Sequence, residues 1–124
     1  ATHSNARALC DHRRNLNDRQ LKALARRGCV AGVVFYNGFV RSDSRENIPT
    51  LANVVAHIDH IAQVAVIDHV GIGADYEGMD RPVPELSDVS RLPRLWEALA
   101  KLYSSRDIAK IAGGNFLRVF ERSF

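Results

Sequence analysis

Three polar groups in this chain are suited to cutting an amide bond, and each follows a predicted strand or strand stub. His3 follows a short N-terminal stub, Arg14 lies in the loop after it within the run Arg13-Arg14-Asn15, and Asp75 ends a run of apolar and small residues. An imidazole can bind a metal ion, a guanidinium can pair with a carboxylate through two hydrogen bonds, and a carboxylate can act as a base. Together these groups are what hydrolysis of a short peptide requires.

Each of these residues also has a plain structural interpretation. A lone histidine is more often a hydrogen-bonding residue than a metal ligand, and adjacent arginines usually point into solvent. Asp75 can simply cap the turn that ends at Gly78. The sequence alone leaves both interpretations open for all three residues.

The remaining histidines are weaker candidates. His12 precedes the arginines in the same loop, where it can contact either substrate or water. His57 and His60 lie three residues apart on a predicted helix whose isoleucines face the core, so we expect His60 to face outward and His57 to lie on the flank. His69 opens the strand that leads to Asp75, at the opposite end, and is expected to be structural.

The elements that position these groups alternate between strand and helix. Val70 and Ile72 alternate with glycines before Asp75, which is typical of a strand covered on both faces, and the apolar run 29–35 predicts a second strand that ends at 36–38. Ligands of α/β sheets and barrels bind at the carboxyl ends of strands, where Asp75 lies. Helices are predicted at about 18–27, after a capping box formed by Asn17 and Gln20, and at about 50–65.

The rest of the chain is predicted as a loop followed by helices. Pro82 and Pro84 disfavour regular structure in 79–90. Apolar residues then mark one helix, a second begins at Ser104 and is broken by Gly113-Gly114, and a last turn or two begins at Asn115. The apolar residues of the first of these helices are Leu95, Trp96, Leu99 and Leu102.

Strand, helix and strand joined by short links predict an α/β fold with parallel strands. A (β/α)8 barrel uses about 30 residues for each unit, so 124 residues hold at most four units. We therefore expect a single partial domain, 1–124, that forms part of such a barrel; a three-strand open α/β domain is the alternative. The polar start without Met suggests that the chain was cut from a longer protein.

Composition narrows the classes of function. The 17 Lys and Arg are interspersed with 14 Asp and Glu, giving a formal charge of +3, so a nucleic-acid partner is not expected. Cys10 and Cys29 are predicted to be free thiols. No apolar run approaches the roughly 20 residues of a membrane span, so no membrane segment is expected in this stretch. The compartment stays unknown from the residues, with a soluble, cytoplasmic location favoured.

Several motifs occur in the same order as in the renal or membrane dipeptidase family, which the chain resembles over nearly its whole length. The Arg-Arg-Asn and Gly-x-Gly-x-Asp motifs carry most of this resemblance. The motifs are Thr2-His-Ser-Asn-Ala-Arg7, Cys10-Asp-His-Arg-Arg-Asn15, Phe35-Tyr-Asn37, His57-Ile-Asp-His60, Val70-Gly-Ile-Gly-Ala-Asp-Tyr-Glu-Gly78 and Gly113-Gly-Asn-Phe-Leu-Arg-Val-Phe120.

The resemblance implies the C-terminal third of a zinc-dependent dipeptidase, a (β/α)8 TIM-type barrel of the metal-dependent hydrolase kind. Such an enzyme holds two zinc ions bridged by a carboxylate and a hydroxide. By matching position, His3 would bind one zinc and Arg14 the C-terminal carboxylate of the dipeptide. Asp75 would pass a proton from the attacking hydroxide to the leaving amine.

Two departures from the family pattern limit what this chain can do alone. The family's Asp-Phe-Asp-Gly is Asp75-Tyr76-Glu77-Gly78 here. The resemblance also implies that the family's other zinc ligands belong to N-terminal strands before residue 1. A catalytic zinc site needs about three protein ligands, so we expect the isolated chain to be inactive until the missing N-terminal part, in the same protein or as a separate chain, completes it. Two alternatives stay open: a barrel relative without peptidase activity, and a small non-catalytic binding module that covers its exposed sheet edges as a homo-oligomer.

Overall fold

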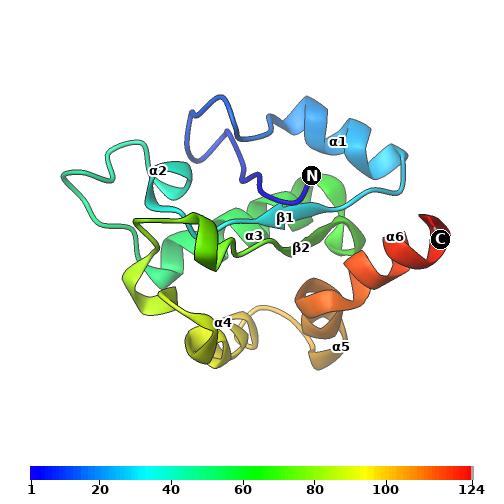
Figure 1. The fold of residues 1–124 in the computed structure, drawn as a ribbon. Helices are drawn as coiled ribbons and strands as arrows, with labels where there is room; N and C mark the ends of the chain where they lie inside the picture. Colours follow the sequence, from blue (N-terminus) through cyan, green and yellow to red (C-terminus); the bar gives the residue numbers. More distant parts are fainter. Residues whose placement is uncertain (124) are drawn as a thin grey trace.

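The computed structural model describes residues 1–123, and helix α3, Leu51–Ala65, is its central element. The two strands β1, Ala31–Val33, and β2, Val70–Ile72, lie side by side against α3, while α1, Asp18–Arg26, packs on another side of it (Figure 1). Strands and helices thus share one core around α3. Its fully buried side chains include Leu21, Val33, Phe35, Val54, Ile58, Ile61, Val70, Leu86, Leu95, Leu99 and Ile111.

The two strands pair in parallel, as the alternation of elements predicts, with Gly32 opposite Gly71. Both are shorter than the predicted strands. The N-terminal segment runs along the other edge of β1: Gly32 N–H donates to the carbonyl of Ala1 (2.7 Å) and Ser4 N–H to that of Gly32 (3.0 Å). The result is a mixed α/β fold, in which the described residues contain a two-stranded sheet; the barrel stays a prediction.

The predicted capping box starts α1 and is confirmed. Gln20 N–H donates to Asn17 Oδ1 (2.8 Å), and Asn17 N–H donates to Gln20 Oε1 (2.9 Å). These bonds satisfy two backbone groups that the first turn of a helix leaves unpaired. Helices α1 and α3 both begin and end within one residue of the bounds predicted for them.

Two segments contain more structure than the sequence predicts. A single turn of helix, α2, Asn37–Val40, follows three residues after β1, where Asn37 N–H donates to the carbonyl of Arg81 (3.0 Å). The predicted loop 79–90 contains two short 3-10 helices, η3, Pro84–Leu86, and η4, Val89–Arg91. Proline favours the first position of η3, where its missing N–H would have no partner in any case.

The C-terminal helices differ from the prediction at two places. Helix α4, Leu92–Leu99, ends before Leu102, which is 57% exposed instead of packed on the helix. Helices α5, Ser105–Ala109, and α6, Asn115–Ser123, are not separated by a break at Gly113-Gly114. A π-helical segment, η5, Lys110–Gly114, joins them, with Asn115 N–H donating to the carbonyl of Lys110.

Tertiary contacts explain why the paired glycines do not end the helix. The Asn115 side-chain amide donates to the carbonyls of Ile67 and Val70, at 2.8 Å each. These bonds anchor the start of α6 to β2. A long-range constraint of this kind overrides the local preference of glycine to end a helix.

His57 was wrongly placed on the flank of its helix: its side chain is 1% exposed and faces the core side. Ala6 N–H donates to its Nδ1 (3.1 Å), and its Nε2 is hydrogen-bonded to the carbonyl of Val40 (2.9 Å). Burial lowers the pKa of this ring, more than the Val40 bond raises it. A neutral ring protonated on Nε2 satisfies both partners, so His57 is a structural residue.

Two further findings concern the surface of the described part. Cys10 is buried and Cys29 is exposed, and both are free thiols, as predicted. Within residues 1–123 no helix has the length and apolar character needed to cross a membrane.

Candidate active site

His3, Arg14 and Asp75, distant in sequence, line one pocket of about 390 Å³. The pocket lies where the N-terminal segment, the loop before α1 and the turn after β2 meet. The sequence predicted a role for each of these residues, and the structure brings them together. The other lining residues are His12, Tyr36, Phe39, Gly78, Met79 and Asp80.

Asp75 has an unusual backbone conformation, with φ of +66° in the left-handed region. Gly78 N–H donates to its carbonyl (3.1 Å), and a Cβ on Gly78 would lie 2.5 Å from Asp75 Oδ1. The turn is thus closed by the backbone of Asp75, while its side chain makes no capping hydrogen bond. A non-glycine residue held in this region is a reason to look for function.

His3 faces Asp75 across the pocket, with Nε2 3.7 Å from Asp75 Oδ1. Its Nδ1 is hydrogen-bonded to the hydroxyl of Thr2 (2.9 Å). The backbone of Thr2 lies so close to β2 that a Cβ on Gly73 would come within 1.7 Å of the Thr2 carbonyl oxygen. Glycine at position 73 therefore lets the segment that carries His3 approach the strand that leads to Asp75.

Arg14 is exposed, and its guanidinium lies over the ring of Phe39, 5.7 Å from the ring centre. Its backbone N–H donates to Nδ1 of His12 (3.1 Å), and the His12 ring is 4.6 Å from that of Phe39. His12 therefore shapes the loop that presents Arg14, in addition to lining the pocket.

Two buried asparagines hold these segments together. Asn15 Oδ1 accepts from Asn5 N–H (3.1 Å), and Asn15 Nδ2 donates to the carbonyls of Cys10 (3.0 Å) and Phe39 (2.9 Å). Asn5 pairs with the backbone of Val34 through both its Oδ1 (2.8 Å) and its Nδ2 (3.0 Å). Sequence reasoning missed this function, although each asparagine stands within two residues of a predicted site residue.

Tyr76, next to Asp75, places its ring in the core, edge-on to Phe35 at 5.8 Å between ring centres. Its buried hydroxyl has no hydrogen-bond partner among the described residues. Burial, with a smaller effect of Asp88, raises its pKa to about 12. The aromatic ring anchors the turn that carries Asp75, and the hydroxyl adds nothing to that anchoring.

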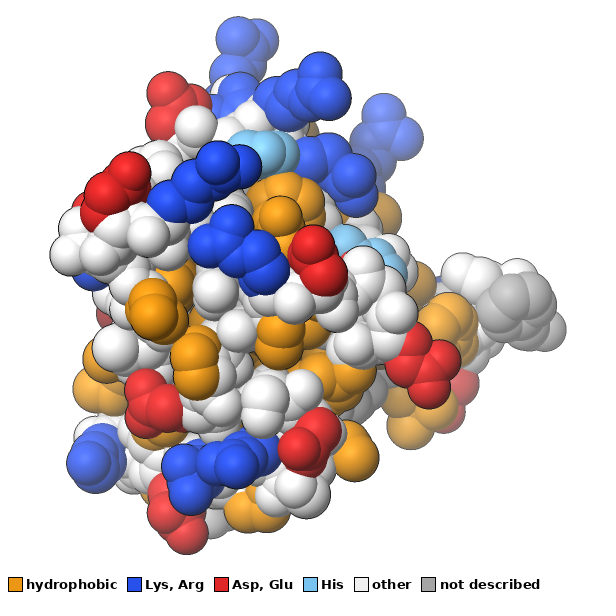
Figure 2. Space-filling view, turned by 60° about the vertical axis from the view of Figure 1, so that its left-hand side comes forward, with side chains coloured by type: hydrophobic (Ala, Val, Ile, Leu, Met, Phe, Trp, Pro, Cys, Tyr) orange, Lys and Arg blue, Asp and Glu red, His pale blue; other side chains and the backbone are white. Residues whose placement is uncertain are grey.

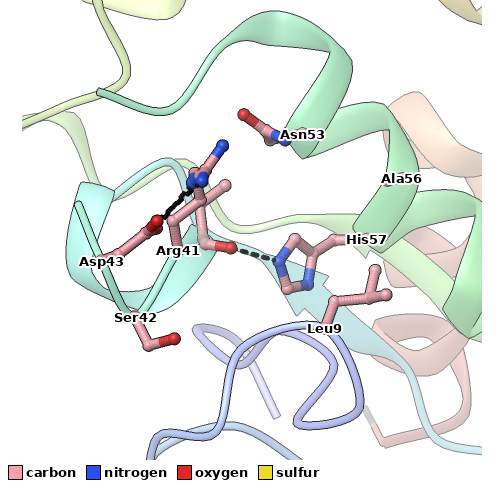
Figure 3. Close-up of a pocket in the computed structure, with 8 residues that line it drawn as sticks. Leu9, Arg41, Ser42, Asp43, Asn53, Ala56 and His57 are labelled. Atoms are coloured by element: carbon pink, nitrogen blue, oxygen red, sulfur yellow. Dashed lines mark hydrogen bonds and ion pairs between the residues drawn. The ribbon is translucent and has the colours of Figure 1, made fainter. Parts of the chain in front are cut away.

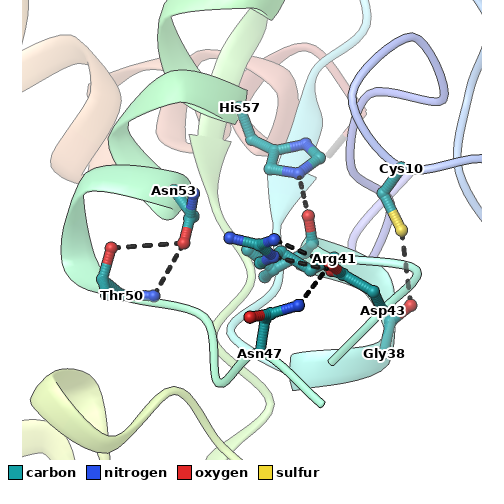
Figure 4. Close-up of polar contacts among 9 residues, drawn as sticks. Cys10, Gly38, Arg41, Asp43, Asn47, Thr50, Asn53 and His57 are labelled. Carbon is teal, nitrogen blue, oxygen red and sulfur yellow. Dashed lines mark hydrogen bonds and ion pairs between the residues drawn. The ribbon is translucent and has the colours of Figure 1, made fainter. Parts of the chain in front are cut away.

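A second pocket, of about 420 Å³, lies between α3 and the loop after α2 (Figure 3). Arg41 donates to both oxygens of Asp43 (2.7 and 2.8 Å), Asn47 also donates to Asp43 (2.8 Å), and these bonds are drawn in Figure 4. The Arg41 guanidinium holds the pKa of the Asp43 carboxyl down at about 2. Because its charged groups neutralise each other and both His57 nitrogens are bonded, this pocket is the weaker candidate.

The surface charge is mixed. Figure 2 shows Lys and Arg side chains gathered towards the top of one face, with histidine among them and acidic side chains beside and below them. On the face shown, these side chains do not form the continuous positive stripe that nucleic-acid-binding proteins usually carry.

The membrane dipeptidase family, peptidase family M19, matches residues 1–123. The chain belongs to this family. The match spans all the segments that form the pocket, so the pocket residues described above lie within the part of the chain that matches the family.

Individual M19 relatives are longer than this chain. It is 45% identical over 123 residues to an uncharacterized protein in the pqqA 5' region of Klebsiella pneumoniae, of which it covers 45%. A metallo peptidase from Rhodobacter sphaeroides, solved with a phosphinate mimic of the dipeptide L-Ala-D-Ala, is 35% identical, with a TM-score of 0.91 over the whole chain. A solved dipeptidase AC is 36% identical with a TM-score of 0.90, and the chain spans about 36% of each of these two structures.

The metal chemistry of metallo peptidases needs more ligands than this M19 chain brings together. Residues 1–123 contain no group of three His, Cys, Asp or Glu side chains placed to hold a metal ion. In the pocket, one imidazole, that of His3, lies near one carboxylate, that of Asp75. A catalytic zinc site takes about three protein ligands, so these residues fit one part of such a site and not the whole.

Proposed function

We propose that this chain is the C-terminal part of a zinc-dependent dipeptidase, and that residues outside it complete a (β/α)8 barrel and the metal site. The observation that carries this proposal is the convergence of His3, Arg14 and Asp75 on one pocket. It is supported by the likeness to a metallo peptidase whose structure holds a dipeptide mimic. A dipeptide has a carboxylate at one end and an ammonium group at the other, and the pocket offers a guanidinium and a carboxylate.

In this proposal each residue has one role. Arg14 binds the C-terminal carboxylate of the dipeptide, since a guanidinium can donate two parallel hydrogen bonds to it. Asp75 lies at the amino end of the substrate and carries a proton from the attacking water to the leaving amine nitrogen. His3 contributes Nε2 to one zinc ion, while the Thr2 hydroxyl accepts from Nδ1 and fixes the orientation of the ring.

The metal ions, when bound, make water nucleophilic at neutral pH and polarise the scissile carbonyl. Because residues 1–123 supply one predicted zinc ligand, we propose that the isolated chain is inactive. The missing ligands come from the N-terminal part of the barrel, whether it belongs to the same polypeptide or to a separate one.

The test compares the 124-residue chain with the gene product that includes sequence upstream of Ala1, each assayed with zinc against a panel of dipeptides. We expect hydrolysis by the longer protein and none by the chain alone. Robust turnover by the 124 residues with zinc would contradict the need for further ligands. A folded, zinc-loaded longer protein that cleaves no dipeptide would contradict the peptidase assignment and favour a relative without that activity.

Substitutions in the longer protein test the individual roles. Asp75→Asn keeps the shape and removes the base, so kcat should fall by about 10²- to 10⁴-fold. Asp88→Asn is the matched control, because Asp88 caps η4 by accepting from Ser90 N–H and asparagine caps equally well. Arg14→Gln should raise KM by roughly 10- to 100-fold, the loss of charge-assisted hydrogen bonds. Equal effects of Asp75→Asn and Asp88→Asn would refute the role of Asp75.

A further inference from the structure

One aromatic ring supports the basic side of the pocket. Phe39 lies on α2, half-buried, and its ring is 4.6 Å from that of His12 and 4.9 Å, edge-on, from that of Tyr36. The guanidinium carbon of Arg14 lies over the same ring, 5.7 Å from its centre. The Phe39 side chain therefore lies next to two other rings that line the pocket and also next to Arg14, the residue predicted to bind a carboxylate.

The backbone of Phe39 is tied to both segments that carry predicted site residues. Its carbonyl accepts from Nδ2 of Asn15 (2.9 Å) and from Nδ2 of Asn5 (3.3 Å). Asn15 directly follows Arg14 in the chain, and Asn5 lies two residues after His3. These bonds fix where the Phe39 ring stands relative to both segments.

Arg14 has no other side-chain anchor in the described part of the chain. No carboxylate of residues 1–123 forms an ion pair with it, so its charge is not neutralised within the pocket. An exposed arginine has many rotamers, and most of them would point the guanidinium away from the pocket. An aromatic face attracts the guanidinium through its negative quadrupole and limits those rotamers, yet leaves the N–H groups at the edge of the guanidinium able to donate.

We propose that Phe39 is a positioning residue for Arg14, and that its ring holds the guanidinium where it meets the C-terminal carboxylate of the substrate. The proposal rests on the proposed function of this site. Phe39 itself needs no contact with the reacting atoms, so its effect should appear in substrate binding and depend on the carboxylate.

The kinetic test uses the longer, zinc-loaded protein. Phe39→Leu should raise KM for a dipeptide by roughly two- to fivefold with kcat little changed, while Phe39→Tyr, which keeps the ring, should raise KM less than Phe39→Leu does. With the corresponding dipeptide amide, which lacks the carboxylate, Phe39→Leu should raise KM by a smaller factor than it does with the dipeptide. Trp96→Leu on α4, also half-buried and aromatic, is the control for loss of packing.

The double variant separates positioning from general damage. In an Arg14→Gln background, Phe39→Leu should add nothing, because the side chain that it positions is gone. The proposal would be overturned if Phe39→Leu raised KM equally for the dipeptide and its amide. It would also be overturned if the increases in KM from Phe39→Leu and Arg14→Gln multiplied in the double variant. Loss of activity in Phe39→Tyr as severe as in Phe39→Leu would also overturn it.

A measurement without activity tests the contact if the peptidase assignment fails. In the NMR spectrum of the full 124-residue chain, the Nε–H signal of Arg14 can be assigned by its disappearance in Arg14→Lys. Phe39→Leu should shift that signal, because the ring current of Phe39 is removed, and Trp96→Leu should leave it in place. An unmoved Arg14 signal in Phe39→Leu would overturn the proposal.

Discussion

Replacing Asn15 by alanine should destabilise the protein by about 3–5 kcal/mol, although no charge and little apolar surface is lost. Asn15 is 1% exposed, and its amide makes three hydrogen bonds to backbone groups. The Cys10 and Phe39 carbonyls keep other donors, His12 N–H and the Asn5 side chain, so each lost bond there costs about 1 kcal/mol. The N–H of Asn5 is left buried and unpaired, which costs about 1–3 kcal/mol more.

Urea unfolding followed by fluorescence measures this free energy directly. Trp96 is the single tryptophan and is half-buried on α4, away from the substituted loop, so its emission reports global unfolding. Asn47→Ala is the matched control: Asn47 is exposed and its side chain makes one hydrogen bond, to Asp43, so the loss of that side chain should cost less than about 0.5 kcal/mol. A loss below about 1 kcal/mol for Asn15→Ala, or one equal to that of Asn47→Ala, would refute the reasoning.

Two further predictions concern buried polar groups. His57 has a lowered pKa in the folded protein, so below pH 6.5 the unfolded chain binds a proton that the folded chain does not. The free energy of unfolding should therefore fall with decreasing pH by up to about 1.4 kcal/mol per unit, until the folded ring also protonates. Denaturant titrations between pH 7.5 and 5.5 and the NMR titration of the ring measure this; titration of His57 at or above 6.5 would contradict it. Tyr76→Phe removes a buried hydroxyl that has no hydrogen-bond partner among residues 1–123, and should raise the free energy of unfolding by about 1 kcal/mol. Urea unfolding measures this as well, and a loss of stability would show that the hydroxyl is satisfied.

Local sequence signals predicted the elements whose causes are local. The capping box at Asn17 and the apolar stripe of α3 act over a few residues, and both helices lie where these signals place them. The π-helical junction at Gly113-Gly114 was not predictable, because it depends on the bonds from Asn115 to residues 67 and 70. The extra turn α2 likewise depends on a backbone bond from Asn37 to Arg81.

The same division applies to the site. His3, Arg14 and Asp75 could be singled out because their side chains have distinct chemistry and stand at the ends of predicted strands or in the loop that follows. Asn5, Asn15 and Phe39 could not, since asparagine and phenylalanine gain their function here only from burial and from partners far along the chain. The position of His57 was predicted wrongly for the same reason. The N-terminal segment that covers His57 is distant in sequence, and the helical periodicity around His57 carries no information about it.

The two pockets differ in how their charged groups are held, and this difference supports the proposal that the first of them binds a zwitterionic substrate. In the second pocket Arg41 and Asp43 are bound to each other, so a ligand would have to break that pair. In the first pocket the holding groups are neutral: an aromatic ring for Arg14, a hydroxyl for His3 and a backbone turn for Asp75. His3 Nε2 and Asp75 Oδ1 lie 3.7 Å apart, farther than the bonded atoms of the Arg41–Asp43 pair. Neutral supports fix the positions of the charges without neutralising them, so the guanidinium and the carboxylate would stay able to pair with the two ends of the dipeptide that we propose as substrate.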